Sequence, residues 1–322
     1  DLRDDGYAGE ILVSTTIGGC LDIDSVVERP IHTVRSGPAM GPVAGRRYAE
    51  LEDKTEAVLV VDMGGTTFDV SLVRDGAITI TQETWLGERF TGHMLGIPAV
   101  DARSVGAGGG SIAWLDSAGL LHVGPQSAGA DPGPALYGRG GTGATVTDAN
   151  IVLGRLSGRA LLGGAMAAFP DLSMAALTRL GEGIALDAQA AAAGIVEIVN
   201  VNMMGAIRTV SVERGEDPRT CALIAFGGAG PLHAVEIARE LGIAQVIVPP
   251  RPGLLSASGL LDAGRRGDFS VTRLVAAAPQ SLAALREGVE ILDASGCAWR
   301  QAEGLDAKNT KNEWSLDLRY LG

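Results

Sequence analysis

Residues 60–73 read Val-Val-Asp-Met-Gly-Gly-Thr-Thr-Phe-Asp-Val-Ser-Leu-Val, with a glycine-rich turn between two apolar runs. The run from Ala57 to Val61 predicts a buried strand, and the alternation that begins at Phe68 predicts a half-buried strand paired with it. Glycines in such a hairpin turn can adopt positive φ and bring backbone N–H groups close to anionic oxygens. The alternative is a plain hairpin turn with solvated carboxylates.

Residues in and beside this turn carry groups suited to a phosphate and its counterion. Asp62 ends the first strand, where its carboxylate suits a hydrated Mg²⁺, and Asp69 lies a short way along the second strand. The residues that offer backbone N–H groups or hydroxyls to a phosphate are Gly64, Gly65, Thr66 and Thr67.

The composition argues against several classes of protein. The 322 residues include 26 basic and 38 acidic side chains, a net charge of −12, so nucleic acid and anionic membranes are not expected partners. Three widely spaced cysteines predict neither a disulfide framework nor a zinc knuckle and favour a reducing, cytoplasmic location. No apolar run approaches the roughly 18 residues of a membrane helix, and the N-terminal residues lack the features of a signal peptide.

Residues 1–56 are predicted to be a mixed lead-in to the hairpin. Short strands are expected near Ile11–Thr15 and Ile31–Val34. Ser36 is expected to cap a helix whose first turn contains Pro38.

A third strand and a long insertion are predicted after the hairpin. Asp75-Gly76 is a strong turn signal, so Ala77–Thr81 is expected to form a third antiparallel strand. Residues 98–153 are rich in Gly, Ser, Asp and Pro, with short apolar pieces such as Ser111–Leu115 and Gly119–Val123. This recurring apolar content predicts an ordered functional insertion and not a flexible linker.

The following segment is predicted to be a long helix and then a βαβ unit. Residues 188–214 carry apolar side chains at spacings of three and four, which is typical of a largely buried helix. The βαβ unit comprises a strand at Cys221–Phe226, a helix at Pro231–Leu241 and a strand at Gln245–Val248.

A second glycine-rich turn, Gly227-Gly228-Ala229-Gly230, joins that strand to that helix. Because Pro231 suits the first helical turn, the positive end of the helix dipole would face an anion or nucleotide. No acidic residue closes the following strand, so this turn is a poor Rossmann fingerprint, and no P-loop segment occurs. His233 could reach a ribose or phosphate, or it could cap its own helix or pack in the core.

Together the two turns, about 160 residues apart, resemble those of the actin, sugar kinase and Hsp70 type of ATPase, a ribonuclease H-like α/β fold. Within that fold the chain is similar to the hydantoinase A/oxoprolinase family, which includes N-methylhydantoinase, 5-oxoprolinase and subunits of acetone-type carboxylases. The strings that carry this resemblance are Ser36–Ala39, Asp101–Ala113, Val123–Ala135, Thr145–Asn150, Phe226–Ala234 and Pro252–Ala257.

The resemblance implies one half of an ATPase cleft with a glycine-rich insertion. Residues 1–56 would lead in from the preceding half, residues 57–265 would form the second half, and residues 266–322 would begin a C-terminal domain. Family members usually carry another Asp-x-Gly-Gly-Thr turn about two hundred residues earlier, which this chain does not contain. Since the chain also lacks an initial Met and ends inside an alternating run, Trp314–Tyr320, we expect it to be a piece of a longer polypeptide.

The chemistry implied is cleavage of ATP coupled to activation of an amide or carbonyl oxygen. The expected cofactors are ATP and Mg²⁺, the substrate is a cyclic amide of hydantoin or 5-oxoproline type, and an oligomer with a hydantoinase B-type subunit or domain is expected. The catalytic residues implied are Asp62 and Asp69, with Asp62 also holding the metal. The nucleotide-binding residues implied are Gly64, Gly65, Thr66, Thr67, Gly227, Gly228, Gly230 and His233.

Two features of the insertion are further candidates. One is a loop that could supply N–H donors to a substrate oxyanion or phosphate, or be only a tight turn, and its residues are Gly106, Gly108, Gly109, Gly110 and Ser111. The other is a set of carboxylates, Asp101, Asp131 and Asp148, that could form a second cation site or act as solvated turn caps. Many relatives carry His where Arg103 stands and Cys where Leu136 stands, so their metal or thiol chemistry is not expected here.

Four functions fit these observations. The leading one is an ATP-dependent hydrolase subunit that opens a cyclic amide through phosphorylation of the amide oxygen. The alternatives are a non-catalytic nucleotide-binding or assembly module, which the missing first turn favours, an ATP-dependent carboxylase subunit, and a small-metabolite kinase that would release a stable phosphorylated product.

Overall fold

The computed structural model describes residues 2–54, 56–87, 90–318 and 320. The chain divides into two compact units. Residues 1–15, 19–34 and 264–322 form the first unit, and residues 16–18 and 35–263 form the second. Residues 35–56, which we expected in the lead-in, therefore belong to the second unit.

The second unit contains a central sheet and the helices that cover it. Its longer strands are β3 (Ala57–Met63), β4 (Phe68–Arg74), β10 (Ala102–Val105), β11 (Ser111–Leu115), β12 (Leu121–Ser127), β15 (Ala222–Phe226) and β16 (Gln245–Ile247). Its two-residue strands are β5 (Ala77–Ile78), β6 (Ile80–Thr81), β7 (Trp85–Leu86), β8 (His93–Met94), β9 (Ala99–Val100), β13 (Ala160–Leu161) and β14 (Met166–Ala167). Its helices are α2 (Ser36–Leu51), α3 (Val146–Val152), α4 (Pro170–Glu182), α5 (Ala188–Val212), α6 (Gly230–Leu241) and α7 (Leu255–Asp262), and short 3₁₀ turns occur at Ala135–Tyr137, Leu162–Gly164, Pro218–Thr220 and Pro252–Leu254.

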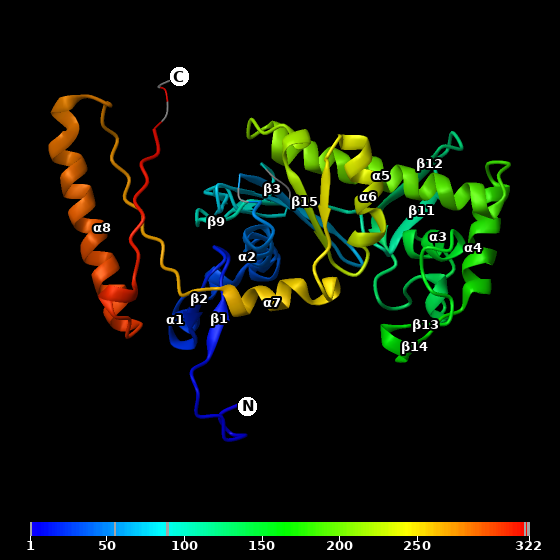
Figure 1. Ribbon diagram of the computed structural model, residues 1–322, viewed down its shortest axis with the longest axis horizontal. Coiled ribbons are helices and arrows are strands. Elements are labelled where there is room, and N and C mark those ends of the chain that lie inside the picture. The colour runs from blue at the N-terminus through cyan, green and yellow to red at the C-terminus, as the bar shows by residue number, and fades with distance from the viewer. Residues whose placement is uncertain (1, 55, 88–89, 319, 321–322) are drawn as a thin grey trace. The chain divides into compact units, whose positions relative to one another are not determined.

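The central sheet is mixed, with the strand order β10-β4-β3-β15-β16. Figure 1 labels two of its strands, β3 and β15. Strand β3 pairs antiparallel with β4 and parallel with β15, which in turn pairs parallel with β16. The predicted α/β class is confirmed. Because β3 has a strand on each edge and helices on both faces, its sequence is a nearly continuous apolar run.

The two faces of the sheet pack against different helices. Val58 and Val60 point to one face, where they join a core with residues of α2 and α7. Leu59 and Val61 point to the other face and join the larger core, to which α5 and α6 contribute. Helices α2 and α7 are distant in sequence yet lie side by side (Figure 1). The alternation along β3 therefore fixes which helix layer each residue reaches.

Helix α5 is the long helix predicted from the apolar spacing. Asp187 caps it by accepting a hydrogen bond from the Ala190 N–H at 2.7 Å. By length and composition α5 could cross a membrane, but 56% of its apolar segment is buried inside the protein. Ile195, Val199 and Ile207 are fully buried in the larger core. The core therefore accounts for the apolar composition of α5.

The edge of the sheet beside β4 differs from the predicted three-strand meander. Asp75 and Gly76 have φ of 49° and 72° and form the expected turn, but β5 pairs with β4 over only two residues. At Ile80 the chain leaves β4, and β6 pairs with β9. Strand β10, from the predicted insertion, then pairs antiparallel with β4. The insertion therefore completes the sheet, and its remaining apolar pieces form the β11–β12 hairpin.

The first unit contains β1 (Leu12–Ser14), β2 (Cys20–Asp22), α1 (Ile23–Glu28) and α8 (Leu282–Ala302), with 3₁₀ turns at Pro30–Thr33, Pro279–Ser281 and Ala307–Asn309. The strand predicted at Ile31–Val34 is wrong, because Pro30 starts a 3₁₀ turn there. The cap predicted at Ser36, in the second unit, is also wrong: Ser36 is already helical, and Arg35, with φ of 58°, is the N-cap. Of the alternating run at the end of the chain, residues 314–318 form no strand, and Arg319 lies outside the described residues.

Candidate functional site

The two carboxylates of the first turn lie opposite each other on the β3–β4 hairpin. Asp62 and Asp69 are paired in the antiparallel register, so their side chains share one face of the sheet. The alternation along β3 places this face toward α2 and α7. The Ser256 hydroxyl, on α7, donates a hydrogen bond to Asp62 Oδ2 at 3.1 Å. The sequence analysis did not identify Ser256 as a site residue, although it lies in the Pro252–Ala257 string.

Burial raises the pKa of the Asp62 carboxyl. The hydrogen bond from Ser256 opposes this rise in pKa, and the negative charge of Asp69 adds to it. A carboxylate that is desolvated beside a second carboxylate favours a nearby cation. Mg²⁺ is commonly held by one or two carboxylates together with waters and phosphate oxygens, so this donor set fits the ion.

Asp69 is held by hydroxyl groups at the sheet edge. It accepts hydrogen bonds from Thr67 Oγ1 at 3.3 Å and from Ser104 Oγ on β10. The Arg35 guanidinium, reaching from the start of α2, donates to Ser104 Oγ at 3.2 Å and to the Ala102 carbonyl at 2.8 Å. The hydroxyl of Ser104 therefore links the positive charge of Arg35 to the Asp69 carboxylate. Sequence reasoning missed Arg35 and Ser104, because their approach to Asp69 depends on β10 joining the sheet.

The turn from Gly64 to Thr67 offers unpaired backbone donors at the surface. Gly65, Thr66 and Thr67 are exposed. The Gly64 N–H closes the turn by donating to the Thr67 carbonyl at 3.0 Å. Within the described part of the chain, the N–H groups of Gly65 and Thr66 donate to no protein acceptor. Adjacent free N–H groups of this kind can bind a phosphate oxygen.

The second turn lies at the same edge of the sheet. Phe226, the last residue of β15, is paired in register with Asp62, so Gly227 follows at the level of the first turn. Gly227 has φ of 82°, and a Cβ there would lie 2.3 Å from Asp62 Oδ1. The Ala229 N–H donates to the Met63 carbonyl at 3.0 Å, and α6 begins at Gly230. The structure therefore brings together the two turns that the sequence analysis singled out, and exposed Gly228 has open space around its Cα.

His233 does not face this surface. Its side chain is fully buried; Nδ1 lies 2.7 Å from Asn200 Oδ1 on α5, and Nε2 lies 3.1 Å from Asn150 Nδ2 on α3. Nδ1–H therefore donates to Asn200, and Nε2 accepts from Asn150. Burial, with the nearby positive charge of Arg155, lowers the pKa of His233 to about 4. Both ring nitrogens are engaged, which favours the core role over the contact with ribose or phosphate.

The 106–111 loop lies directly against the first turn. A Cβ on Gly108 would lie 2.5 Å from the Thr66 nitrogen, so only glycine fits at this approach. The N–H groups from Ala107 to Ser111 all donate to acceptors within the chain. They are therefore not free to bind a substrate oxyanion or a phosphate, which differs from the expectation for this loop.

The three insertion carboxylates do not converge. Asp101 pairs with Arg214, and exposed Asp131 precedes a cis peptide bond to a proline. Asp148 is fully buried in the capping box of α3 with Thr145, where it also accepts hydrogen bonds from the Ser173 hydroxyl and from two backbone N–H groups of the Ala135–Tyr137 turn. Among the residues described here, no group of three or more metal-ligating side chains forms a cation site. The turn-cap alternative thus accounts for Asp148.

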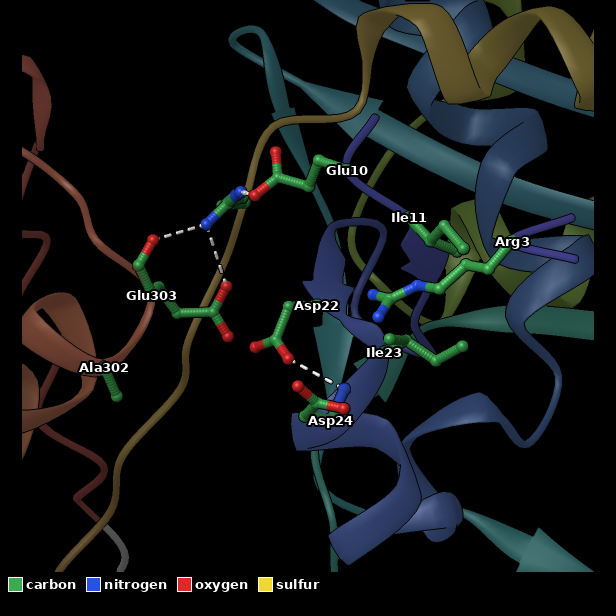
Figure 2. A pocket seen from close by; sticks show the side chains of 9 residues that line it. Arg3, Glu10, Ile11, Asp22, Ile23, Asp24, Ala302 and Glu303 are labelled. Atoms are coloured by element: carbon green, nitrogen blue, oxygen red, sulfur yellow. Dashed lines mark hydrogen bonds and ion pairs between the residues drawn. The ribbon is translucent and has the colours of Figure 1, made fainter. Parts of the chain in front are cut away.

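A cavity of about 260 Å³ lies in the first unit, and none of the predicted site residues lines it. Two of its lining carboxylates, Glu10 and Glu303 (Figure 2), pair with Arg265. Asp22 caps α1 by accepting from the Asp24 N–H at 2.8 Å. Burial and the neighbouring Asp22 raise the pKa of Glu303. Glu10, Asp22, Arg265 and Glu303 therefore have partners within the chain. The cavity is lined by Arg3, Glu10, Ile11, Asp22, Ile23, Asp24, Arg265, Ala302 and Glu303.

The chain is similar in sequence and in fold to several known proteins. A family model described as hydantoinase/oxoprolinase matches residues 1–268. The caprolactamase subunit alpha of Pseudomonas jessenii is 38% identical over 299 residues, which cover 92% of this chain and 42% of that protein. The crystal structure of the ATP-dependent caprolactamase from Pseudomonas jessenii superposes with a TM-score of 0.77 at 36% identity, covering 92% of this chain and 42% of the other. A nucleotide-free structure of an acetone carboxylase superposes with a TM-score of 0.73 at 30% identity, covering 81% of this chain and 36% of the other. The chain thus spans about two fifths of the length of these proteins.

Proposed function

Because the chain belongs to the hydantoinase/oxoprolinase family, we propose that it is the part of an ATP-dependent hydrolase that binds the phosphates of ATP, in an enzyme that opens a cyclic amide. The observation that carries the proposal is the exposed 64–67 turn, whose free N–H groups lie beside the paired carboxylates of Asp62 and Asp69. Free amide donors next to desolvated carboxylates suit a phosphate chain and its cation.

The second unit would then be one half of an actin-like ATPase cleft. Its hairpin carries one glycine-rich turn, and the parallel β15–α6 unit carries the other at the same sheet edge. In such a cleft the first turn would bind the β- and γ-phosphates. The second turn, with Gly227, Gly228 and Gly230, would lie against the nucleoside. The partner half of the cleft would come from outside these residues.

The side chains of the hairpin would position the phosphoryl group for transfer. The N–H groups of Gly65 and Thr66 would hold its oxygens, and the hydroxyls of Thr66 and Thr67 would add donors. Asp62 and Asp69 would hold Mg²⁺, which supplies charge neutralisation on the phosphate oxygens when it is bound. Ser256 keeps the Asp62 carboxylate oriented and supports its ionised form. These roles rest on positioning and electrostatics, as phosphoryl transfer requires.

The proposed reaction transfers the γ-phosphoryl group of ATP to the amide oxygen of a cyclic amide. This phosphorylation releases ADP and makes the amide carbon more electrophilic. Water then adds to that carbon, the ring C–N bond breaks as the nitrogen takes a proton, and the acyl phosphate that remains is hydrolysed to the ring-opened acid and phosphate. The caprolactamase relative, an ATP-dependent enzyme, supports this class of reaction. Hydantoin, 5-oxoproline and caprolactam are therefore the substrates to test.

A carboxylase subunit is the second candidate, because the acetone carboxylase structure superposes on most of this chain. In that case the same phosphate-binding turn would activate a carbonyl oxygen, and carboxylation would replace hydrolysis. Several relatives are named as subunits, which supports the proposal of a second, hydantoinase B-type subunit in a cytoplasmic complex.

The proposal is tested by a thermal-shift titration of this chain with Mg-ATP, Mg-ADP and NAD, since a ligand of the folded state raises the melting temperature. We expect stabilisation by the adenine nucleotides that is lost in Asp62→Asn. The matched control is Asp187→Asn, which removes one exposed carboxylate but keeps a good helix N-cap.

Stabilisation by NAD alone, or equal responses in wild type and Asp62→Asn, would contradict the proposed site. The reaction itself is tested in the complete enzyme with its partner subunit. Release of ADP together with a ring-opened acid supports the hydrolase, whereas a bicarbonate-dependent carboxylated product supports the carboxylase.

A further inference from the structure

Two carbonyl groups of the first turn are held by the 106–111 loop. The Gly109 N–H donates to the Gly64 carbonyl at 3.0 Å, and the Gly110 N–H donates to the Gly65 carbonyl at 2.6 Å. A third donor, Ser127 Oγ on β12, reaches the Gly65 carbonyl at 3.4 Å. The turn is therefore held through the carbonyl groups of Gly64 and Gly65, while the N–H groups of Gly65 and Thr66 donate to no acceptor in the described part of the chain.

Because the peptide bond is planar, the hydrogen bonds to these two carbonyl groups also fix the direction of the N–H groups that follow them. In a trans peptide the C=O of one residue and the N–H of the next point in opposite directions. The Gly64 carbonyl points to the loop, so the Gly65 N–H points away from it. In the same way the Gly65 carbonyl directs the Thr66 N–H outward. Glycine residues can adopt many backbone conformations, and these two contacts select the one that presents both N–H groups to solvent.

Other motifs of the insertion hold the loop in place. The Thr147 N–H and Oγ1 both donate to the Gly109 carbonyl, at 2.7 and 2.8 Å, from the first turn of α3. The Ala128 N–H donates to the Gly110 carbonyl at 2.8 Å. Ser111 Oγ accepts from the Gly108 N–H at 2.8 Å and fixes the loop internally. Three strings that the sequence analysis singled out thus meet behind the phosphate turn.

We propose that the 106–111 loop and Thr147 are a backbone clamp that presets the phosphate turn, holding the Gly65 and Thr66 N–H groups outward before a nucleotide binds. The role of Thr147 as a positioning residue rests on the proposed function, because it assumes that the turn binds a phosphate. The hydrogen bonds of the clamp do not depend on that function. The insertion then acts on the phosphates from behind the turn and does not touch the ligand.

The clamp is tested first without any ligand, by hydrogen exchange resolved to single amides. We expect the Gly109 and Gly110 N–H groups to be protected and those of Gly65 and Thr66 to exchange at nearly unprotected rates. Thr147→Val should lower the protection of Gly109 and Gly110, because it removes the hydroxyl donor, and Thr147→Ser should restore it. Equal exchange rates at all four amides of wild type would overturn the clamp.

The consequence for binding is tested with Mg-ADP and adenosine as two probes. In Gly108→Ala the new Cβ would lie 2.5 Å from the Thr66 nitrogen and push the turn away from the loop. We expect Mg-ADP affinity to fall by about tenfold or more while adenosine affinity changes less than about twofold, because only the phosphates use these donors. Gly205→Ala is the control, since a Cβ at that exposed helical position meets nothing within 4 Å.

A matching loss of ADP and adenosine affinity in Gly108→Ala would mean that the nucleotide site has unfolded as a whole, and this would overturn the positioning role. The milder Thr147→Val variant repeats the comparison and should show the same selective loss for ADP. If the complete enzyme, with the partner half of the cleft, binds neither probe, the proposed function fails, while the exchange experiment still decides whether the clamp exists.

Discussion

The Ser256 hydroxyl lies 3.1 Å from Asp62 Oδ2, although 194 residues separate them in sequence. This contact ties α7 to the end of β3, where the first glycine-rich turn begins. A hydroxyl donor stabilises a carboxylate in its charged form. Ser256 therefore opposes the burial that raises the pKa of Asp62, and it keeps the carboxylate available for a cation.

Replacement of Ser256 by Ala should raise the pKa of Asp62 further and weaken Mg-nucleotide binding by roughly tenfold, since a hydrogen bond to a charged group is worth about 1.5–3 kcal/mol. The loss should be largest at acidic pH, where Asp62 becomes protonated first. The measurement is Mg-ADP affinity across pH 5–8. Ser258→Ala is the control, because the Ser258 hydroxyl donates to a carbonyl of its own helix. An affinity loss independent of pH would count against the role of Ser256 through Asp62.

Asp62→Asn should stabilise the fold at neutral pH while it removes metal binding. The pKa of Asp62 is higher in the folded state than in the unfolded chain, so the folded state binds more protons between the two values. The stability of wild type therefore falls as the pH rises through this window. Asp62→Asn has no carboxyl group at this position to titrate, so its stability does not show this fall. Urea unfolding should show the variant to be more stable than wild type at pH 7 and equal to it at pH 3. A variant less stable at pH 7 would contradict the cost assigned to burial.

The strands, helices and turns near the candidate site follow from sequence patterns because local rules determine them. The apolar run of β3, the alternation of β4 and the spacing of α5 each have one periodicity, and each was placed to within a few residues. The Gly227 turn was also visible, since its three glycines precede a proline in the first turn of α6. These elements carry most of the residues of the proposed phosphate site.

Contacts between distant segments could not be predicted in this way. A glycine-rich loop signals close approach, but its sequence does not tell which way its peptide planes point. Whether the 106–111 loop donates to a ligand or forms only a tight turn was therefore left open. His233 was ambiguous for the same reason, because its partners Asn150 and Asn200 come from two other helices. For Asp148 a signal was present: Thr145 three residues earlier forms a capping-box pattern, which predicts a structural carboxylate.

Replacement of the buried Asp148 by Ala should destabilise the protein by roughly 2–4 kcal/mol, because five hydrogen-bond donors would lose their acceptor. Two of these donors are the N–H and hydroxyl of Thr145, and the other three come from other segments. Asp131→Ala, at an exposed position of the same insertion, should change stability by less than about 0.5 kcal/mol. Urea unfolding with and without Mg²⁺ measures both. If Mg²⁺ stabilises wild type but not Asp148→Ala, the capping role would be insufficient and a cation role would be restored.

Neutral His233 should make stability depend on pH in the acid range. Its folded-state pKa of about 4 lies below the ordinary value near 6.5, so the unfolded chain binds more protons between these values. Stability should therefore fall as the pH drops from 6.5 to 4, by about 3 kcal/mol from this group. Because other groups also titrate, the measurement is the difference between wild type and His233→Gln, which cannot titrate. A difference that stays constant over pH 4–7 would contradict the buried neutral state.

Gly227 and Gly228 are adjacent, yet the structure predicts opposite responses to alanine. At Gly227 the φ of 82° is unfavourable for alanine, and the Cβ would meet Asp62 Oδ1 at 2.3 Å and the Met63 carbonyl oxygen at 2.4 Å. Gly227→Ala should cost roughly 1–3 kcal/mol or more and displace the Asp62 carboxylate, so Mg-ADP binding should fall as well. At Gly228 a Cβ meets nothing within 4 Å, so Gly228→Ala should leave stability nearly unchanged. Any loss of ADP affinity in Gly228→Ala then reports a ligand that approaches the turn, because no protein group crowds that position. Equal melting temperatures for the two variants would show that the turn is not held against Asp62 as the structure describes.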